Sequence, residues 1–399
     1  MAALDFGLVG LLVAAMSGIM AGDFPAHFLR DDGKRTATAN ERVVMDLLHR
    51  QGPASRADLA RLTGLAPHSI TRLVEPLLDR GLVREGTPQP MGVGKPSTRL
   101  AIVADAAFSV GVSVTTDSVA LVLLDLSGAV VGRATAPLAS VDLDVAAQQI
   151  AAMIDTAATT AALDLARRVG IGIGVTGYFI GDGARLNPPA QLDPWALVPL
   201  DTMLAERLGG PVWIDNDGNV AAVGEMMLGA GRDARDFAYL YFAAGFGGGV
   251  VADGMPMRGT HGNAGEFASI LPEGWPQPNL ESLRRFLVEQ HCRDYPDLHA
   301  MLAGFDPHDP AIDGWLDACT PSLNLVASAI SATLDPNLIV LGGRLPPALA
   351  ERIAARIRLT NPARRGHHRP AARIVPSTLT EDAAAIGAAM LPLRAAFFG

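Results

Sequence analysis

The chain has 399 residues, of which 49% are hydrophobic and 18% charged, and this balance excludes a disordered tail protein, a collagen and a coiled coil. The two cysteines are too few for a disulfide framework, so a reducing, cytoplasmic environment is expected. Aromatic residues make up only 5%, which argues against a stacking platform for single-stranded nucleic acid. The length suits about two or three domains.

The net charge of −9 is unevenly distributed along the chain. Residues 34–100 contain eleven Lys or Arg and six Asp or Glu, a net charge of +5, so the rest of the chain carries −14. A basic segment joined to an acidic remainder predicts that the segment alone contacts a polyanion.

The amino terminus, residues 1–35, contains an apolar run at 6–21. This run is slightly short for a membrane span, and no Lys or Arg precedes it as in a signal peptide. Three interpretations compete: a short anchor, a failed signal peptide, and a translation start placed too early, with Met20 as the true first residue. We favour the last, because a predicted DNA-binding segment follows almost at once, and we expect an apolar or flexible extension without membrane association.

Residues 36–105 are predicted to form a winged helix-turn-helix. Thr38 with Glu41 three residues later is a capping box that predicts the start of the first helix, and Ser55 with Asp58 predicts the start of a second, short helix. A proline at 67 suits the first turn of a third helix, whose apolar side chains can be buried together: Ile70, Leu73, Val74 and Leu77. The residue before that proline is an alanine, which is a poor helix cap.

The third helix is the expected recognition helix. Near its start it leaves four polar side chains exposed, where such a helix contacts base edges in the major groove: His68, Ser69, Thr71 and Arg72. A Gly/Pro-rich hairpin tip at 87–99 carries Lys95 and Arg99, placed as a wing places cations against phosphates. A three-helix interaction module with solvated charges is the alternative; the wing and the local charge favour double-stranded DNA.

From residue 106 onward the pattern is that of an α/β domain. Three antiparallel strands are expected near 109–115, 118–126 and 129–138, and a similar strand, turn and strand series recurs at 237–259. Between and after them come further predicted elements: helix 143–166, strand 169–177, strand 213–217, helix 219–231, helix 311–333, strand 338–343, helix 347–358, strand 373–376 and helix 381–395. Two lobes that each open with a β-meander suggest a duplicated fold with a ligand cleft between them.

The ordered series WIDNDGN, GEMMLGAGR, AAGFGGGVVADG, RGTHGNAGEFASI and DPNLIVLGGRL, preceded by the winged helix, resembles the ROK family of repressors, open reading frames and kinases. The resemblance covers roughly residues 36–399. It implies an actin-like ATPase or sugar-kinase fold over 106–399, with lobe I at about 106–225 plus helix 381–395 and lobe II at about 226–380. It also implies a homodimer or homotetramer.

The same resemblance implies a sugar site formed by Asn216, Asp217, Glu266 and Glu281, with Asp217 at the position of the catalytic base in the kinases. Carboxylates suit this task because they accept charge-assisted hydrogen bonds from vicinal hydroxyl groups. A different interpretation is that Asn216 and Asp217 only cap the helix that follows them.

The positions that handle phosphate depart from the kinase pattern. Ser113 stands where the kinases carry an aspartate, and Ala243-Ala244-Gly245 replaces Gly-Thr-Gly. Four glycines persist in the loop, but a hairpin turn also requires glycine: Gly245, Gly247, Gly248 and Gly249. Support for ATP and Mg²⁺ as cofactors is therefore weak.

The family's structural zinc site is expected to be lost. Ser269 stands at the position of a ligating histidine, and the loop at 271–279 contains no cysteine. We therefore expect no metal and no other cofactor.

These features predict a cytoplasmic, DNA-binding transcriptional regulator, with repression as its expected activity, whose kinase-like body senses a sugar or sugar derivative without catalysing a reaction. The main alternative is an ATP-dependent sugar kinase that carries a DNA-binding module. A third interpretation is a constitutive DNA-binding protein with an empty cleft.

Overall fold

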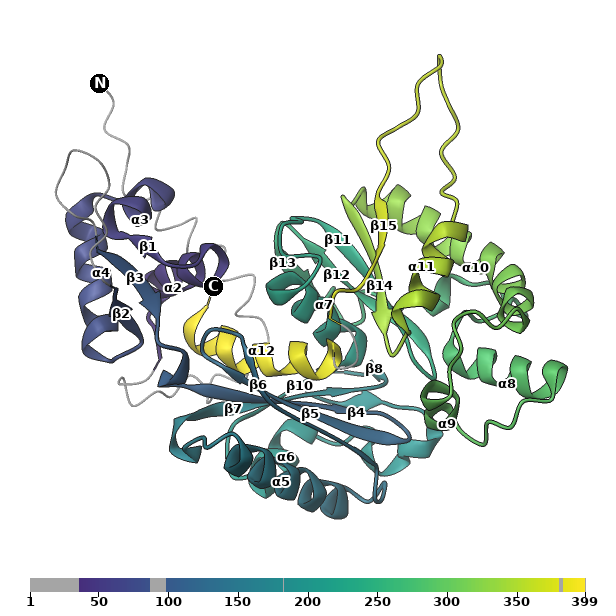
Figure 1. Cartoon of the computed structure of the whole chain (residues 1–399), viewed down its shortest axis with the longest axis horizontal. Helices are drawn as coiled ribbons and strands as arrows, with labels where there is room; N and C mark the ends of the chain where they lie inside the picture. The colour runs from purple at the N-terminus through teal and green to yellow at the C-terminus, as the bar shows by residue number, and fades with distance from the viewer. Residues whose placement is uncertain (1–35, 87–97, 182, 380–382, 399) are drawn as a thin grey trace.

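The computed structural model describes residues 36–86, 98–181, 183–379 and 383–398. Figure 1 shows a small head beside two larger lobes, each built on a β-sheet. The extension 1–35 and most of the predicted wing tip, including Lys95, lie outside the described residues. No helix in the part of the chain that is described has the length and apolarity needed to cross a bilayer.

The head is a winged helix, as predicted. It contains α2 (Ala39–Gln51), α3 (Arg56–Thr63), α4 (Pro67–Asp79) and a three-stranded sheet in the order β1 (Ala54–Ser55), β3 (Arg99–Ile102), β2 (Val83–Glu85). The predicted capping box at Thr38 is present, Ser55 and Asp58 form a second one, and Gly64 ends α3 in the left-handed conformation. Ala66 offers α4 no side-chain cap. Ile70, Val74 and Leu77 are buried in the head's core, whereas Leu73 is only half-buried.

Lobe I is built on a five-stranded sheet in the order β10-β7-β4-β5-β6. Its antiparallel meander and two parallel strands are β4 (Phe108–Val114), β5 (Ser118–Asp125), β6 (Val130–Pro137), β7 (Arg168–Val175) and β10 (Val212–Asn216). Two helices, α5 (Leu143–Thr160) and α6 (Leu200–Leu208), cover one face, and α12 (Ala383–Phe397) covers the other (Figure 1).

Glycines in β4 and β7 allow α12 to lie directly on this sheet. Gly111 and Gly172 are register partners, and a Cβ atom on either would lie 1.9 or 1.8 Å from a carbonyl oxygen of α12. The alternation of glycine with Val or Ile in these strands, and the alanine-rich sequence of α12, follow from this close approach.

Lobe II contains a second five-stranded sheet in the order β13-β12-β11-β14-β15. Its strands are β11 (Phe237–Phe242), β12 (Phe246–Ala252), β13 (Met255–Met257), β14 (Leu338–Gly343) and β15 (Arg373–Pro376). Its helices are α8 (Leu280–His291), α9 (Leu298–Ala303), α10 (Ala311–Leu334) and α11 (Pro347–Arg356). The first two helices, and a short hairpin of β8 (Tyr178–Phe179) and β9 (Leu186–Asn187) in lobe I, were not expected from the sequence.

Two helices fill the space between the sheets. The helix α7 (Asp217–Leu228) packs on the sheet of lobe II and against α12 (Figure 1). The contact is again made through glycine, because a Cβ atom on Gly387 would lie 1.6 Å from the carbonyl oxygen of Val220. The core between the sheets is continuous with the core of the head in one hydrophobic cluster. The described parts therefore form one packed unit.

Candidate functional site

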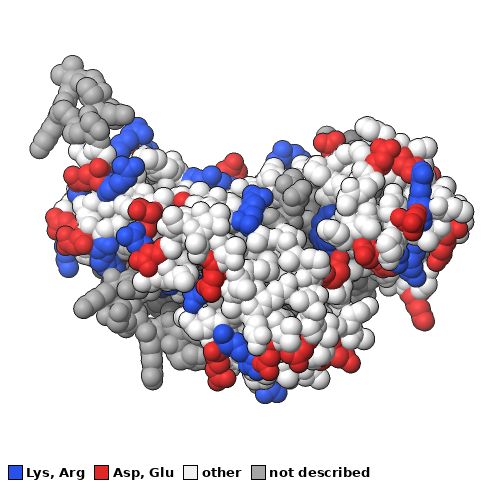
Figure 2. Space-filling model, turned by 60° about the horizontal axis from the view of Figure 1, so that its bottom comes forward, with Lys and Arg blue, Asp and Glu red and all other residues white. Residues whose placement is uncertain are grey.

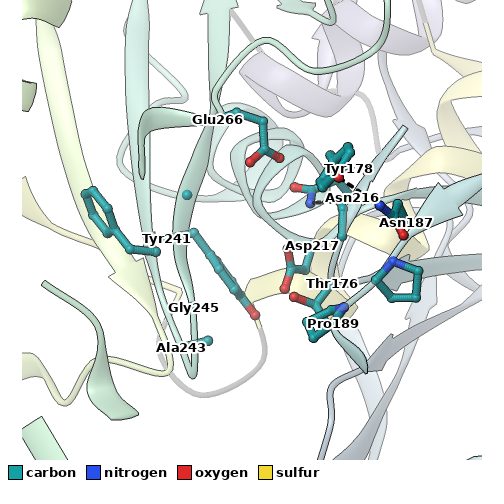
Figure 3. Close-up of a pocket in the computed structure, with 14 residues that line it drawn as sticks. Thr176, Tyr178, Asn187, Pro189, Asn216, Asp217, Tyr241, Ala243, Gly245 and Glu266 are labelled. Carbon is teal, nitrogen blue, oxygen red and sulfur yellow. Dashed lines mark hydrogen bonds between the residues drawn. The ribbon is translucent and has the colours of Figure 1, made fainter. Parts of the chain in front are cut away.

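A cavity of about 360 Å³ lies between the two lobes (Figure 3). The cavity is surrounded by the carboxyl ends of β7 and β10, by the β8–β9 hairpin, and by β11, β12 and the loop before residue 267. The residues that line it are Thr176, Gly177, Tyr178, Asn187, Pro188, Pro189, Asn216, Asp217, Tyr241, Ala243, Gly245, Phe246, Gly247 and Glu266. Three of the four predicted sugar-binding residues thus line one cavity.

Asn216 ends β10 and caps α7. Its Oδ1 accepts hydrogen bonds from the amides of Gly218 at 2.8 Å and Asn219 at 3.3 Å, and its Nδ2 donates to the carbonyl of Gly177 at 2.6 Å. The capping interpretation therefore holds for Asn216. The same side chain also fixes the loop that follows β7, which forms one wall of the cavity.

Asp217, the first residue of α7, is 6% exposed. Burial raises its pKa to about 6, and the nearby Glu266 adds to this increase, although hydrogen bonds from Gly218 and Thr176 oppose it. Burial also raises the pKa of Glu266. Figure 3 shows both carboxylates directed toward the space between Tyr241 and Asn216. Two such acceptors suit a polyhydroxylated ligand, and a carboxylate with a pKa near neutrality also suits a general base.

Glu281 is not among the residues that line the cavity. It lies in the first turn of α8, where its two carboxylate oxygens accept hydrogen bonds from Nη2 and Nε of Arg284 at 2.6 and 2.9 Å. The structure thus brings together Asn216, Asp217 and Glu266 but directs the carboxylate of Glu281 to a neighbour on its own helix.

The four glycines of the predicted phosphate loop divide into two pairs. Gly245 and Gly247 line the cavity, and a Cβ atom on either would meet no atom within 4 Å. A Cβ atom on Gly248 would lie 1.9 Å from the carbonyl oxygen of Tyr239, and one on Gly249 would lie 2.8 Å from that of Gly218. Packing of β12 against β11 and α7 accounts for the second pair.

Sequence reasoning missed four polar side chains of the cavity: Thr176, Tyr178, Asn187 and Tyr241. Thr176 was within reach, because it follows β7 and the carboxyl ends of parallel strands share one edge of a sheet. Tyr178 and Asn187 come from the unexpected hairpin, in which the Asn187 amide donates to the Tyr178 hydroxyl at 2.7 Å (Figure 3). Its two-residue strands are too short for a periodic signal.

Side chains at and beside the predicted phosphate-binding region are engaged by other groups of the protein. Tyr241 is 5% exposed; burial raises the pKa of its hydroxyl well above the usual value, and Ser113 is its hydrogen-bond partner. Burial alone would raise the pKa of Asp117, but Arg344 of lobe II lowers it below its usual value. Arg344 Nη1 lies 2.9 and 3.0 Å from the two carboxylate oxygens. The Asp117 carboxylate is thus bound by Arg344, and the Ser113 and Tyr241 side chains are bound to each other.

The donor set near Glu266 does not fit zinc. Ser269 donates its hydroxyl to the Glu266 carbonyl at 2.6 Å, and a neutral hydroxyl is not one of the usual zinc ligands. Within the described ranges, no three His, Cys, Asp or Glu side chains gather where they could hold a metal ion.

The head presents the predicted recognition residues on its surface. His68 and Arg72 are exposed, and Ser69 and Thr71 are half-buried on the same end of α4. Arg99 is exposed at the start of β3, with its Nη1 3.4 Å from the carbonyl of Pro53. Figure 2 shows Lys and Arg side chains interspersed with Asp and Glu on the head at the left of the molecule, and several acids with a few Lys or Arg along the lower edge of the body.

Comparisons with known proteins agree with this architecture. The sequence model of the ROK family matches residues 109–292. An uncharacterised protein of Sinorhizobium fredii, y4fQ, is 31% identical over 370 residues, which cover 90% of this chain and 92% of that protein. The xylose repressor of Bacillus subtilis is 28% identical over 232 residues, which cover 58% of this chain and 60% of the repressor.

Among solved structures, a ROK family transcriptional regulator homologous to Mlc of Escherichia coli superposes with a TM-score of 0.61 at 22% identity, over 88% of this chain and 94% of the regulator. A ROK family glucokinase from Streptomyces griseus, solved with glucose and AMPPNP, superposes with a TM-score of 0.60 at 21% identity, over 71% of this chain and 99% of the kinase. The fold of the body is therefore that of the actin-like sugar kinases. The chain belongs to the ROK family.

Proposed function

We propose that this protein is a sugar-responsive transcriptional regulator that binds operator DNA through its head and a sugar or sugar derivative in the cavity between its lobes. Repression is the expected activity, because relatives of this chain are named as repressors. Asp217 and Glu266 are the proposed acceptors for ligand hydroxyl groups, and Asn216 positions the wall beside them.

One observation carries the proposal: α7 connects the cavity directly to the head. The helix begins at Asp217 in the cavity and ends at Leu228. In the turn that follows, Arg232 donates from Nη2 to the carbonyl oxygens of His49 at 2.9 Å and Arg50 at 2.5 Å, which are among the last carbonyls of α2. A ligand that moves α7 therefore moves a residue bound to the head.

The turn that carries Arg232 is held by a buried acid of α7. Glu225 is fully buried and accepts hydrogen bonds from the amide of Ala230 at 2.6 Å and from the hydroxyl of Ser377. Burial raises the pKa of Glu225 above its usual value. Because the acid ties the turn to the helix, the position of Arg232 follows the position of α7.

The head also contacts the end of α12. The Ala37 amide donates to the Ala396 carbonyl at 2.8 Å, and the ring of His49 packs against that of Phe398 with centroids 4.7 Å apart. His49 is 8% exposed, and burial lowers its pKa to about 4, so the imidazole is neutral at pH 7. The head is thus held by a largely desolvated interface whose geometry depends on both α7 and α12.

The signal requires unequal binding. A sugar that bound the DNA-competent and DNA-released forms equally would change nothing, however tight its binding. The cavity meets this condition in principle, because its walls come from both lobes and a bridging ligand favours one lobe separation over others.

The proposal is tested on the full chain. In vitro selection from random-sequence duplexes would identify an operator, and anisotropy titrations would then measure affinity with and without glucose, xylose and N-acetylglucosamine. We expect a selected sequence whose preference is lost in Arg72→Ala, and one sugar that changes operator affinity about 10-fold. The absence of any enriched sequence, or of any response to the sugars, would contradict the proposal.

A sugar kinase with a DNA-binding head is the second candidate, and the raised pKa of Asp217 favours it. The residues around Ser113 and Tyr241 oppose it. A coupled assay of ADP release with ATP, Mg²⁺ and the same sugars separates the two candidates. Sugar-dependent ADP release that disappears in Asp217→Asn would establish the kinase.

A further inference from the structure

A basic hairpin projects from lobe II between α11 and β15, above the rest of the lobe in Figure 1. Between residues 352 and 380 the chain contains seven arginines and no Asp or Glu, although the whole chain carries −9. We call residues 361–369 the basic hairpin.

The basic hairpin has a defined backbone. Arg364 and His367 exchange both backbone hydrogen bonds, at 2.9 and 3.1 Å. The two residues between them, Arg365 and Gly366, have φ angles of 53° and 79°, as a type I′ turn requires. At the base, the Asn361 side chain donates to the Arg369 carbonyl at 2.8 Å and accepts from its amide at 3.2 Å. The hairpin is therefore closed at its tip and its base.

The limb that leads into the hairpin is fastened to α10. The amide of Arg358 donates to Oδ1 of Asn324 at 2.6 Å, and that of Thr360 donates to the Ser328 hydroxyl at 2.8 Å. Residues 362–370 are all exposed. The hairpin thus has an ordered backbone although its residues bury no surface in the core. Packing in the core therefore does not explain the entropy cost of ordering it.

The arginines of the hairpin are free to meet a partner. At its root, Arg352 and Arg356 both pair with Asp313 and are neutralised within lobe II. Arg364, Arg365 and Arg369 form no ion pair with a described acidic residue. Three guanidinium groups therefore extend into solvent together with two imidazoles, those of His367 and His368.

We propose that the basic hairpin binds the phosphate backbone of duplex DNA as a second contact, separate from the head. Its composition favours this partner over a protein, because between Asn361 and Arg369 the only apolar side chains are those of one proline and one alanine. Protein interfaces need an apolar or aromatic centre, whereas phosphate contacts need only cations. Figure 1 places the hairpin on the same side of the molecule as α3 of the head, opposite α5 and α6. Such contacts add affinity without reading sequence.

The test compares two full-length triple variants with equal loss of charge. One is Arg364→Ala/Arg365→Ala/Arg369→Ala; the control is Arg167→Ala/Arg235→Ala/Arg293→Ala, which removes three arginines that pair with acids elsewhere. Affinity for a random-sequence duplex of about 40 base pairs is measured against salt concentration. We expect the hairpin variant to lose about 2 to 3 in the slope of log K against log[salt], with weaker binding, and the control to keep the wild-type slope.

A slope that is equal in the hairpin variant and the wild type would overturn the inference. So would a change of sedimentation coefficient with an unchanged slope, which would show that the hairpin binds a second copy of the chain. The regulator proposal is judged separately, because it depends on the sequence preference lost in Arg72→Ala and on the sugar response, and neither involves the hairpin.

Discussion

The position of Asp217 in the cavity suits hydrogen bonding to a ligand, but the burial of its carboxylate disfavours the charged form. It faces the cavity as a hydrogen-bond acceptor, yet it is buried at the start of α7 with Glu266 near it, and its pKa rises from an ordinary value of 3.8 to about 6. An aspartate whose pKa is raised by folding adds stability while it is protonated, below about pH 3.8, and that stability is lost as the pH rises through 6. At pH 7.5 the ionised carboxylate of Asp217 therefore lowers the free energy of unfolding, which is a cost to stability.

Asp217→Asn should remove this cost, since asparagine does not ionise. We expect the free energy of unfolding of the variant, relative to wild type, to rise by about 3 kcal/mol between pH 3.8 and pH 7.5, as two pKa units imply. Urea unfolding at several pH values measures it, with the exposed Asp193→Asn as the control for replacing a carboxylate. A difference that did not vary with pH would show that the carboxylate is solvated.

At the scale of elements, the strand β12 shows what a glycine-rich motif does in this fold. A Cβ atom on Gly248 would lie 1.9 Å from the backbone of β11, whereas one on Gly245 would point into open space. Gly248→Ala should therefore destabilise the protein by about 3 kcal/mol or more through forced backbone shifts, and Gly245→Ala should cost less than about 1 kcal/mol. Thermal unfolding of the pair measures the contrast. Equal melting temperatures would mean that β12 moves away from β11 at little cost.

The same strand shows how far sequence reasoning reaches. The capping box at Thr38, the two meanders and the apolar strands are local patterns, so the sequence predicts them. The family resemblance predicts one site for Asn216, Asp217 and Glu266, which line the same cavity. Whether a glycine serves a ligand or a neighbouring strand is decided by tertiary contacts, as Gly245 and Gly248 show. Glu281 fits the motif, but the Arg284 guanidinium binds its carboxylate; the spacing of three residues permits this pair on a helix, yet the helix α8 itself was not expected from the sequence.

The helix α7 provides the sharpest test of coupling between cavity and head. Arg232→Ala removes both hydrogen bonds to the carbonyls of α2 and replaces no residue of the proposed DNA-contacting face of α4 or of the cavity lining. We expect the variant to bind operator alone and sugar alone with affinities within about 3-fold of wild type. The effect of sugar on operator affinity should fall from about 10-fold to below 3-fold. The measurement is the anisotropy titration with and without sugar.

Arg235→Ala is the matched control, because Arg235 lies three residues further along and its guanidinium pairs with the exposed Asp253 and with no other acid of the described residues. It should keep the full sugar effect. If Arg232→Ala also kept the full effect, the signal would have to travel through α12 and Phe398 instead.

At the scale of the whole molecule, side chains join the two lobes at several places, and two of these contacts differ in kind. Beside the cavity, the Asn263 side chain accepts from the Phe179 amide at 2.7 Å and donates to its carbonyl at 3.0 Å. On the side of Ser113, Arg344 of lobe II binds Asp117 of lobe I with little exposure, the two side chains being 17% and 27% exposed. The contact between Arg344 and Asp117 is an ion pair, so a charge reversal at Asp117 turns attraction into repulsion and leaves the Asn263 contact unchanged.

Asp117→Arg places two guanidinium groups opposite each other and should open the lobes, because the change from attraction to repulsion in this half-buried setting costs about 2 kcal/mol or more. We expect a larger radius of gyration in small-angle X-ray scattering and weaker sugar binding. The charge swap Asp117→Arg/Arg344→Asp should restore both values toward wild type, since it rebuilds the pair in the opposite direction. Failure of the swap to rescue a clear effect of the single variant would assign that effect to lost packing at the β4–β5 turn. An unchanged radius and affinity in Asp117→Arg would mean that the remaining contacts, among them those of Asn263 and Arg258 and the packing of α7 against α12, fix the separation of the lobes without this ion pair.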